Sequence, residues 1–146
     1  MEDQMKTKVL LVDDEKDFVD AMGERLKIRD FNVTIAYSGK KALEIIGKVD
    51  FDVIVLDVMM PEMTGTEALR QIKDINPLLQ VIMLTGAATV ENAIEGMKLG
   101  AYDFLLKPAS ADDLAEKIHA AKTIKAEHDE RIRQAEISKI VAHKGW

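Results

Sequence analysis

The stretch FDVIVLDVMMPEMTG, residues Phe51 to Gly65, decides how the rest of the chain folds. It is a continuous apolar run with β-branched members that ends at one carboxylate, Asp57, and passes into a turn held by Pro61 and Gly65. Such a run between turn signals is typical of a strand buried on both faces. Asp57 is therefore predicted to lie where the strand leaves the core, and a carboxylate there needs a cation or hydrogen-bond donors nearby.

Four further apolar runs predict strands, and helical patterns separate them from one another. The predicted strands are Lys8–Val12, Phe31–Tyr37, the opening stretch, Leu79–Leu84 and Tyr102–Leu106. The predicted helices are Asp17–Ile28, Lys40–Gly47, Thr64 to about Asp74, Thr89–Leu99, and a last helix that opens at Ser110 and continues toward the C-terminus. Alternation of this kind predicts an α/β fold, a doubly wound five-stranded parallel sheet with helices on both faces.

Composition limits the classes of protein to which the chain can belong. Its 146 residues suffice for one domain of common size, and 47% hydrophobic with 32% charged residues is typical of a soluble globular protein. No apolar segment approaches the ~20 residues of a membrane span, so we expect no membrane partner and a cytoplasmic location. Zero cysteines exclude disulfides, thiol catalysis and Cys-ligated zinc.

The net charge of −6 is unevenly distributed along the chain. Residues 110–146 carry seven acidic and seven basic side chains, so the excess of negative charge lies on residues 1–109. Nucleic-acid binding without sequence preference depends on basic surface. The charge pattern therefore predicts no direct nucleic-acid binding by this chain.

Polar side chains follow four of the predicted strands at the point where each strand ends. They are Asp13 and Asp14, then Asp57, Thr85 and Lys107. Taken singly, each is typical of a turn, a helix cap or a surface. Parallel strands, however, bring their carboxyl ends to one edge of the sheet, where ligands bind. Carboxylate oxygens suit Mg²⁺, and Asp57 could then attack a phosphorus atom while Thr85 and Lys107 hold the phosphoryl oxygens.

The set of motifs resembles the receiver domain of two-component response regulators, the CheY-like family. The matching motifs are LLVDDE at 10–15, VLDVMMPEMTG at 55–65, LTGAA at 84–88 and DFLLKP at 103–108. The resemblance covers residues from about 7 to 121. It implies a flavodoxin-like sheet with strand order 2-1-3-4-5.

Four residues take phosphoacceptor and metal roles by this resemblance. Asp57 becomes the acceptor of a phosphoryl group from the phosphohistidine of a sensor histidine kinase. Asp13 and Asp14 become the acidic pair that holds Mg²⁺, helped by Asp57 and the backbone carbonyl of Met59. The implied cofactor is therefore Mg²⁺.

Four more residues take switching roles by the same resemblance. Thr85 is similar to the switch hydroxyl that moves toward the phosphoryl group, and Lys107 to the lysine that contacts it. The Lys107–Pro108 peptide bond is expected to be cis. Phe104 occupies the switch-aromatic position, where many relatives carry Tyr, so any rotamer switch here would act by packing alone.

The resemblance also predicts how the chain is divided and which proteins it meets. Residues 1–121 form the predicted receiver domain and residues 122–146 a helical extension or linker. The expected partners are a histidine kinase and an output domain or downstream protein. A heptad pattern of Ile118, Ile132 and the alanines at 121, 135 and 142 suggests a homodimer through the C-terminal helix, although Lys125 and His128 interrupt it.

Two other classes of function share this kind of sheet. An aspartyl-phosphate-forming phosphohydrolase usually needs a second acid near the nucleophile, and the residues after Asp57 are Val58, Met59, Met60 and Pro61. A flavin-binding electron carrier would need a phosphate cradle after the first strand, where this chain places acids. The sequence favours a phosphorylation-dependent signalling switch, and the phosphohydrolase is the alternative.

Overall fold

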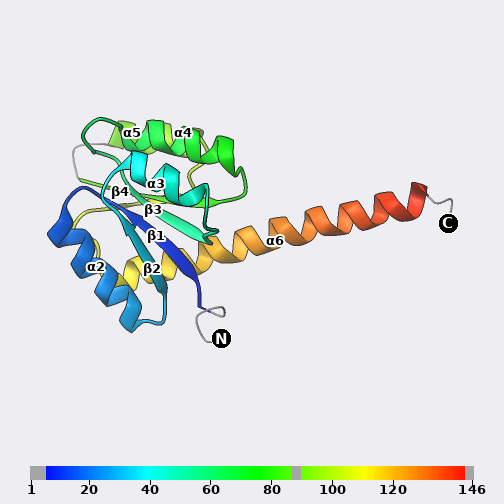
Figure 1. The fold of residues 1–146 in the computed structure, drawn as a ribbon, viewed down its shortest axis with the longest axis horizontal. Helices are drawn as coiled ribbons and strands as arrows, with labels where there is room; N and C mark the ends of the chain where they lie inside the picture. Colours follow the sequence, from blue (N-terminus) through cyan, green and yellow to red (C-terminus); the bar gives the residue numbers. More distant parts are fainter. Residues whose placement is uncertain (1–5, 87–89, 144–146) are drawn as a thin grey trace.

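The computed structural model describes residues 6–86 and 90–143, and a five-stranded parallel sheet forms its centre (Figure 1). The strands are β1 Lys8–Val12, β2 Asn32–Ala36, β3 Val53–Asp57, β4 Gln80–Thr85 and β5 Asp103–Leu106. Their order across the sheet is β2-β1-β3-β4-β5, and every neighbouring pair is parallel. The doubly wound α/β fold and the strand order 2-1-3-4-5 are both confirmed.

Helices follow the strands in alternation and cover both faces of the sheet. They are α2 Lys16–Ile28, α3 Gly39–Ile46, α4 Gly65–Ile75, α5 Val90–Lys98 and α6 Ala111–His143. Residue Thr89, where the fourth helix was predicted to begin, lies outside the described residues. Three helices begin after capping residues, because the side chains of Ser38, Thr64 and Ser110 each accept a hydrogen bond from an amide three residues later.

The sheet separates two apolar layers, because side chains alternate between the faces of an extended strand. On β1, Leu10 and Val12 join the cluster on the face that carries α3 and α4. Val9 and Leu11 join the cluster on the face that carries α2 and α6. All residues of the inner strands β3 and β4 are buried, whereas four of the five residues of the edge strand β2 are only partly buried. This explains why β3 is an unbroken apolar run in the sequence.

Most predicted boundaries differ from the structure by one or two residues, and the start of β3 differs by two. The strand predicted to begin at Phe51 begins at Val53, because the preceding Asp52 pairs with the start of β1 through its side chain. Asp52 accepts a hydrogen bond from the Lys8 amide at 2.8 Å, and its own amide donates to the Lys8 carbonyl. Phe51 is nevertheless buried and belongs to the core.

Helix α6 packs against the domain only along its first part and then projects away from it (Figure 1). Leu114, Ile118 and Ala121 are completely buried against the sheet, whereas Ile132 is exposed. The predicted dimer seam is therefore wrong in its first two members, because the domain core already covers Ile118 and Ala121. Within the described residues, no helix combines the length and the apolar character needed to cross a membrane.

Candidate functional site

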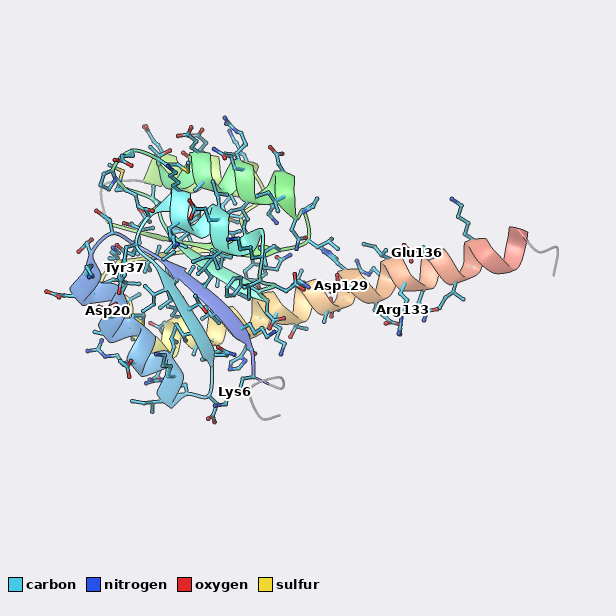
Figure 2. All side chains as sticks on the ribbon, in the orientation of Figure 1. Lys6, Asp20, Tyr37, Asp129, Arg133 and Glu136 are labelled. Atoms are coloured by element: carbon cyan, nitrogen blue, oxygen red, sulfur yellow. The ribbon has the colours of Figure 1, made fainter. Side chains whose placement is uncertain are left out.

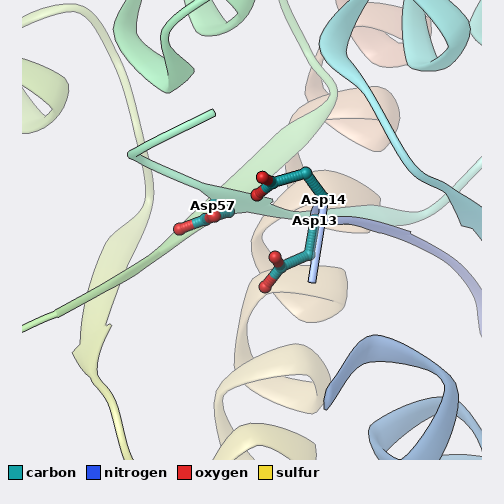
Figure 3. Close-up of side chains that lie close together, drawn as sticks. All are labelled: Asp13, Asp14 and Asp57. Atoms are coloured by element: carbon teal, nitrogen blue, oxygen red, sulfur yellow. The ribbon is translucent and has the colours of Figure 1, made fainter. Parts of the chain in front are cut away.

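Asp57 is the last residue of β3 and lies at the edge of the sheet formed by the carboxyl ends of the strands (Figure 3). It is only 4% exposed, because β3 is the middle strand of five and has helices on both faces. The amide of Met59 donates a hydrogen bond to Asp57 Oδ1 at 3.4 Å. The predicted position of Asp57 at the exit of the buried strand is thus the position observed.

The turn after β3 closes tightly over the backbone of Asp57. The amide of Gly65, the first residue of α4, donates to the Val58 carbonyl at 2.8 Å. A Cβ atom on Gly65 would meet the Asp57 carbonyl oxygen and would lie 2.7 Å from Val58 Cα, closer than real Cβ contacts occur. A residue without a side chain is therefore required where helix α4 begins.

Asp13 and Asp14 follow β1, which is the neighbour of β3 in the sheet. Their carboxylates and that of Asp57 converge, with one oxygen of each within 4.8 Å of the others (Figure 3). Asp13 is buried and its Oδ1 accepts a hydrogen bond from the Glu15 amide at 2.9 Å, whereas Asp14 is exposed. The site thus has two buried carboxylates and one that faces solvent.

Lys107 follows β5 and extends its ammonium group toward the carboxylates of Asp13, Glu15 and Asp57. Its Nζ lies 2.9 Å from Asp13 Oδ2, 3.0 Å from Glu15 Oε1 and 3.7 Å from Asp57 Oδ1. The same atom lies 4.6 Å from the centre of the Phe18 ring. One cation is therefore shared among three acids at the edge of the sheet.

Thr85 ends β4 and is completely buried. Asp57, the last residue of β3, pairs with Leu84 of β4, so Thr85 lies one residue beyond the level at which β3 ends. Its hydroxyl donates to the Gly86 carbonyl at 3.2 Å, and its carbonyl accepts from the Lys107 amide at 2.7 Å. The ends of β4 and β5 are thereby held together beside Asp57.

The two remaining predicted positions lie on and just after β5. Phe104 is partly buried against the cluster that carries α3 and α4, and it pairs with Met83 of β4. The Lys107–Pro108 peptide bond is cis, the geometry that the resemblance implies. All predicted site residues of the described chain therefore gather at one edge of the sheet or directly beneath it.

The surroundings of Asp57 oppose its ionisation. Burial, together with the nearby charge of Asp13, raises the pKa of the Asp57 carboxyl from 3.8 to about 7. The Lys107 ammonium and the Met59 amide act in the opposite direction but do not cancel the effect of burial. A cation between the carboxylates would favour the ionised form, because an opposite charge within a few ångströms lowers the pKa of an acid.

Lys107 keeps its charge in this site for the converse reason. Burial by itself lowers the pKa of the ammonium, but hydrogen bonds to Asp13 and Glu15 and the charges of Asp57 and Asp13 outweigh it. The net result is a raised pKa, so the group is a permanent cation at neutral pH. The site therefore has a fixed positive charge beside an acid that titrates near pH 7.

The donor set of this site fits a hard divalent cation. Three carboxylates whose oxygens converge, one of them open to solvent, match the preference of Mg²⁺ for a few oxygen ligands and several waters. Asp13, Asp14 and Asp57 are the residues that could hold such an ion. The Met59 carbonyl remains a prediction as the fourth ligand.

Two residues in the site were not identified from the sequence. Glu15 is the last residue of the LLVDDE motif and Phe18 lies in the predicted helix Asp17–Ile28, and neither was assigned a role, yet both contact Lys107. Glu15 is the N-cap residue of α2 and Phe18 lies in its first turn, so the spacing of three residues places both on one side of the start of the helix. This spacing, next to the acidic pair, is the signal that could have indicated them.

Comparison with known proteins gives the same picture as the geometry. The family model for the response regulator receiver domain matches residues 9–119. The transcriptional regulatory protein ZraR of Salmonella typhimurium is 37% identical over 116 residues, which cover 80% of this chain and 26% of that protein. The response regulator SaeR of Staphylococcus epidermidis is 34% identical over 137 residues, or 92% of this chain and 59% of that protein. The chain thus spans only part of the length of either relative.

A solved structure extends the likeness to the whole fold. The crystal structure of a response regulator receiver domain protein from Clostridium thermocellum superposes with a TM-score of 0.79 at 37% identity. It covers 82% of this chain and 97% of that one. Because the family model matches well over half of the residues, this chain belongs to the response regulator receiver domain family of two-component systems.

Proposed function

We propose that the chain is a phosphorylation-dependent signalling switch in which Asp57 accepts a phosphoryl group. The observation that carries the proposal is the meeting of three carboxylates, a buried hydroxyl and a cationic Lys107 at one edge of the sheet. A structural ion pair needs one acid for one base. Three acids around one base leave negative charge that a divalent cation would balance.

The transfer proceeds on the carboxylate of Asp57. An oxygen of the ionised side chain attacks phosphorus of a kinase phosphohistidine, the O–P bond forms as the P–N bond breaks, and the electron pair stays on the imidazole nitrogen. Lys107 and Thr85 are the groups that contact the transferred oxygens. Bound Mg²⁺ would offset the repulsion between the carboxylate and the phosphoryl oxygens.

The same site links phosphorylation to the surface of the domain. Thr85 ends β4, and its carbonyl accepts the Lys107 amide, so a hydroxyl drawn toward the phosphoryl group moves a point that β4 and β5 share. Phe104 lies on β5 next to Met83 of β4 and follows such a movement by packing alone. The output surface in this proposal is the one formed by β4, α5 and β5.

The proposal includes partners and a division of the chain. A sensor histidine kinase supplies the phosphoryl group in the cytoplasm, and an output domain or downstream protein reads the result. Residues 1–121 act as the receiver and residues 122–146 as its helical extension. The name of ZraR, a transcriptional regulatory protein, supports regulation of transcription as one outcome for proteins that contain such a domain.

Mass spectrometry tests the phosphoacceptor directly. Purified protein incubated with Mg²⁺ and acetyl phosphate should gain about 80 Da, the mass of one phosphoryl group, and Asp57→Asn should abolish the gain because only that carboxylate forms the acyl phosphate. Asp74→Asn, which changes an exposed acid on α4, is the matched control and should react like the wild type. Wild-type protein without a mass gain would refute the proposal, and rapid repeated turnover of phosphomonoesters would favour the phosphohydrolase instead.

A further inference from the structure

Lys107 is held by more acids than the phosphoryl site alone requires. Its ammonium is closest to Asp13 and Glu15, at 2.9 and 3.0 Å, and is farther from Asp57, at 3.7 Å. The Phe18 ring lies beside the same nitrogen. In the unphosphorylated protein the lysine is therefore displaced from the acceptor toward the start of α2.

The two acids that hold Lys107 differ in how easily they can release it. The Asp13 side chain is 3% exposed and its other oxygen is bound by the Glu15 amide, so its position is fixed. The Glu15 side chain is 64% exposed and reaches Lys107 from the protein surface. A carboxylate that leaves a contact for water loses little free energy, so Glu15 is the partner that can be exchanged.

We propose that Glu15 is a latch that holds the Lys107 ammonium away from Asp57 until a phosphoryl group competes for it. The inference rests on the proposed phosphoacceptor role of Asp57. A phosphoryl group on Asp57 carries more negative charge than the carboxylate and presents several acceptor oxygens. It takes the lysine from Glu15, while Asp13 stays in place, so Glu15 is a positioning residue that acts through Lys107.

The local structure makes this role testable without damage to the fold. Glu15 is the N-cap residue of α2, but its side chain makes no capping hydrogen bond. Its backbone contributes instead, because its amide donates to Asp13 and its carbonyl accepts from Val19. Substitution of the Glu15 side chain should therefore leave the start of α2 intact.

The first measurement compares rates of phosphorylation. Wild type, Glu15→Gln and Glu15→Ala are incubated with acetyl phosphate at Mg²⁺ concentrations that saturate each protein, and the mass gain is followed over time. Loss of an exposed ion pair that competes for Lys107 should raise the rate about two- to fivefold. Asp17→Asn removes the same charge two residues away, from a side chain without an ion pair among the described residues, and should react at the wild-type rate.

The second measurement observes the latch without phosphoryl transfer. In metal-free protein an amine-acylating reagent should modify Lys107 faster in both Glu15 variants than in wild type and Asp17→Asn, as quantified by peptide mass spectrometry. If Glu15 had only a structural role, its substitution would not raise the reactivity of Lys107 without also changing thermal stability.

Wild-type protein that takes no phosphoryl group overturns the proposed function and the latch together. Wild-type protein that is phosphorylated, with Glu15 variants no faster and Lys107 no more reactive, overturns the latch alone.

Discussion

At the scale of single residues, the carboxyl of Asp57 stands in an environment built for something other than stability. Its pKa of about 7 means that the metal-free folded protein binds a proton that the unfolded chain, at 3.8, has already released. The folded state is favoured by this group below pH 4. The advantage is lost as the pH rises through 7, because the buried carboxyl must then ionise.

Urea unfolding of metal-free protein at several pH values checks this expectation. Between pH 4 and pH 8 the free energy of unfolding of the wild type should fall relative to that of Asp57→Asn by up to about 4 kcal/mol, since the pKa is raised by about three units and each unit corresponds to about 1.4 kcal/mol. Asparagine does not titrate, and the two proteins have all other titratable groups in common. The difference between their curves therefore reports on the Asp57 carboxyl. Parallel curves for the two proteins would show that Asp57 is not held in its neutral form.

At the scale of elements, the connection from β3 to α4 fixes the acceptor in place. Gly65 begins α4 while its amide bonds to Val58 and its Cα lies against the backbone of Asp57. Thr64 caps the same helix by accepting a hydrogen bond from the Glu67 amide at 3.2 Å. Helix and strand are therefore joined at the residue that carries the chemistry.

Gly65→Ala should damage this junction. The added methyl would overlap the backbone of Asp57 and Val58, which a change of rotamer cannot relieve, so we expect a loss of about 2 to 4 kcal/mol in stability and slower phosphorylation. Gly47→Ala is the matched control, because Gly47 has φ of −71° and an added Cβ meets its nearest neighbour at 3.5 Å. Denaturant unfolding and the mass-gain assay measure both variants, and equal behaviour would contradict the close approach.

The sequence predicts elements better than it predicts the contacts between their side chains. Asp13, Asp57, Thr85 and Lys107 could be brought together from the pattern alone, because each follows an apolar run and parallel strands end at one edge. The contact between Glu15 and Lys107 joins residues 92 positions apart and depends on how the start of α2 is turned toward β5. No local pattern encodes that rotation, so it emerges only in the folded chain.

At the scale of the whole molecule, α6 is one helix with two environments. Its first part completes the core through Leu114, Ile118 and Ala121, and Lys122 donates a hydrogen bond to Thr7. Beyond this point the ion pairs of the described helix are internal, as between Lys125 and Asp129 and between Glu130 and Arg133. Figure 2 shows Asp129 and Arg133 on the projecting part of the helix. With Ile118 and Ala121 buried, the predicted seam could join a second copy of the chain only along the projecting part of α6.

A chain that ends at Ala126 should consequently be as stable as the full chain. We expect its free energy of unfolding to differ by less than about 1 kcal/mol, because the removed residues from 127 to 139, whose side chains the structure describes, contribute surface ion pairs and none belongs to the core. Ile118→Ala, in the packed part of the same helix, should instead cost about 2 to 4 kcal/mol.

Light scattering on both chain lengths decides whether the projecting part also joins two copies. A dimer that becomes a monomer on truncation would support a dimer contact through the exposed part of the predicted seam. A monomer at both lengths, with and without a phosphoryl group on Asp57, would reject that contact.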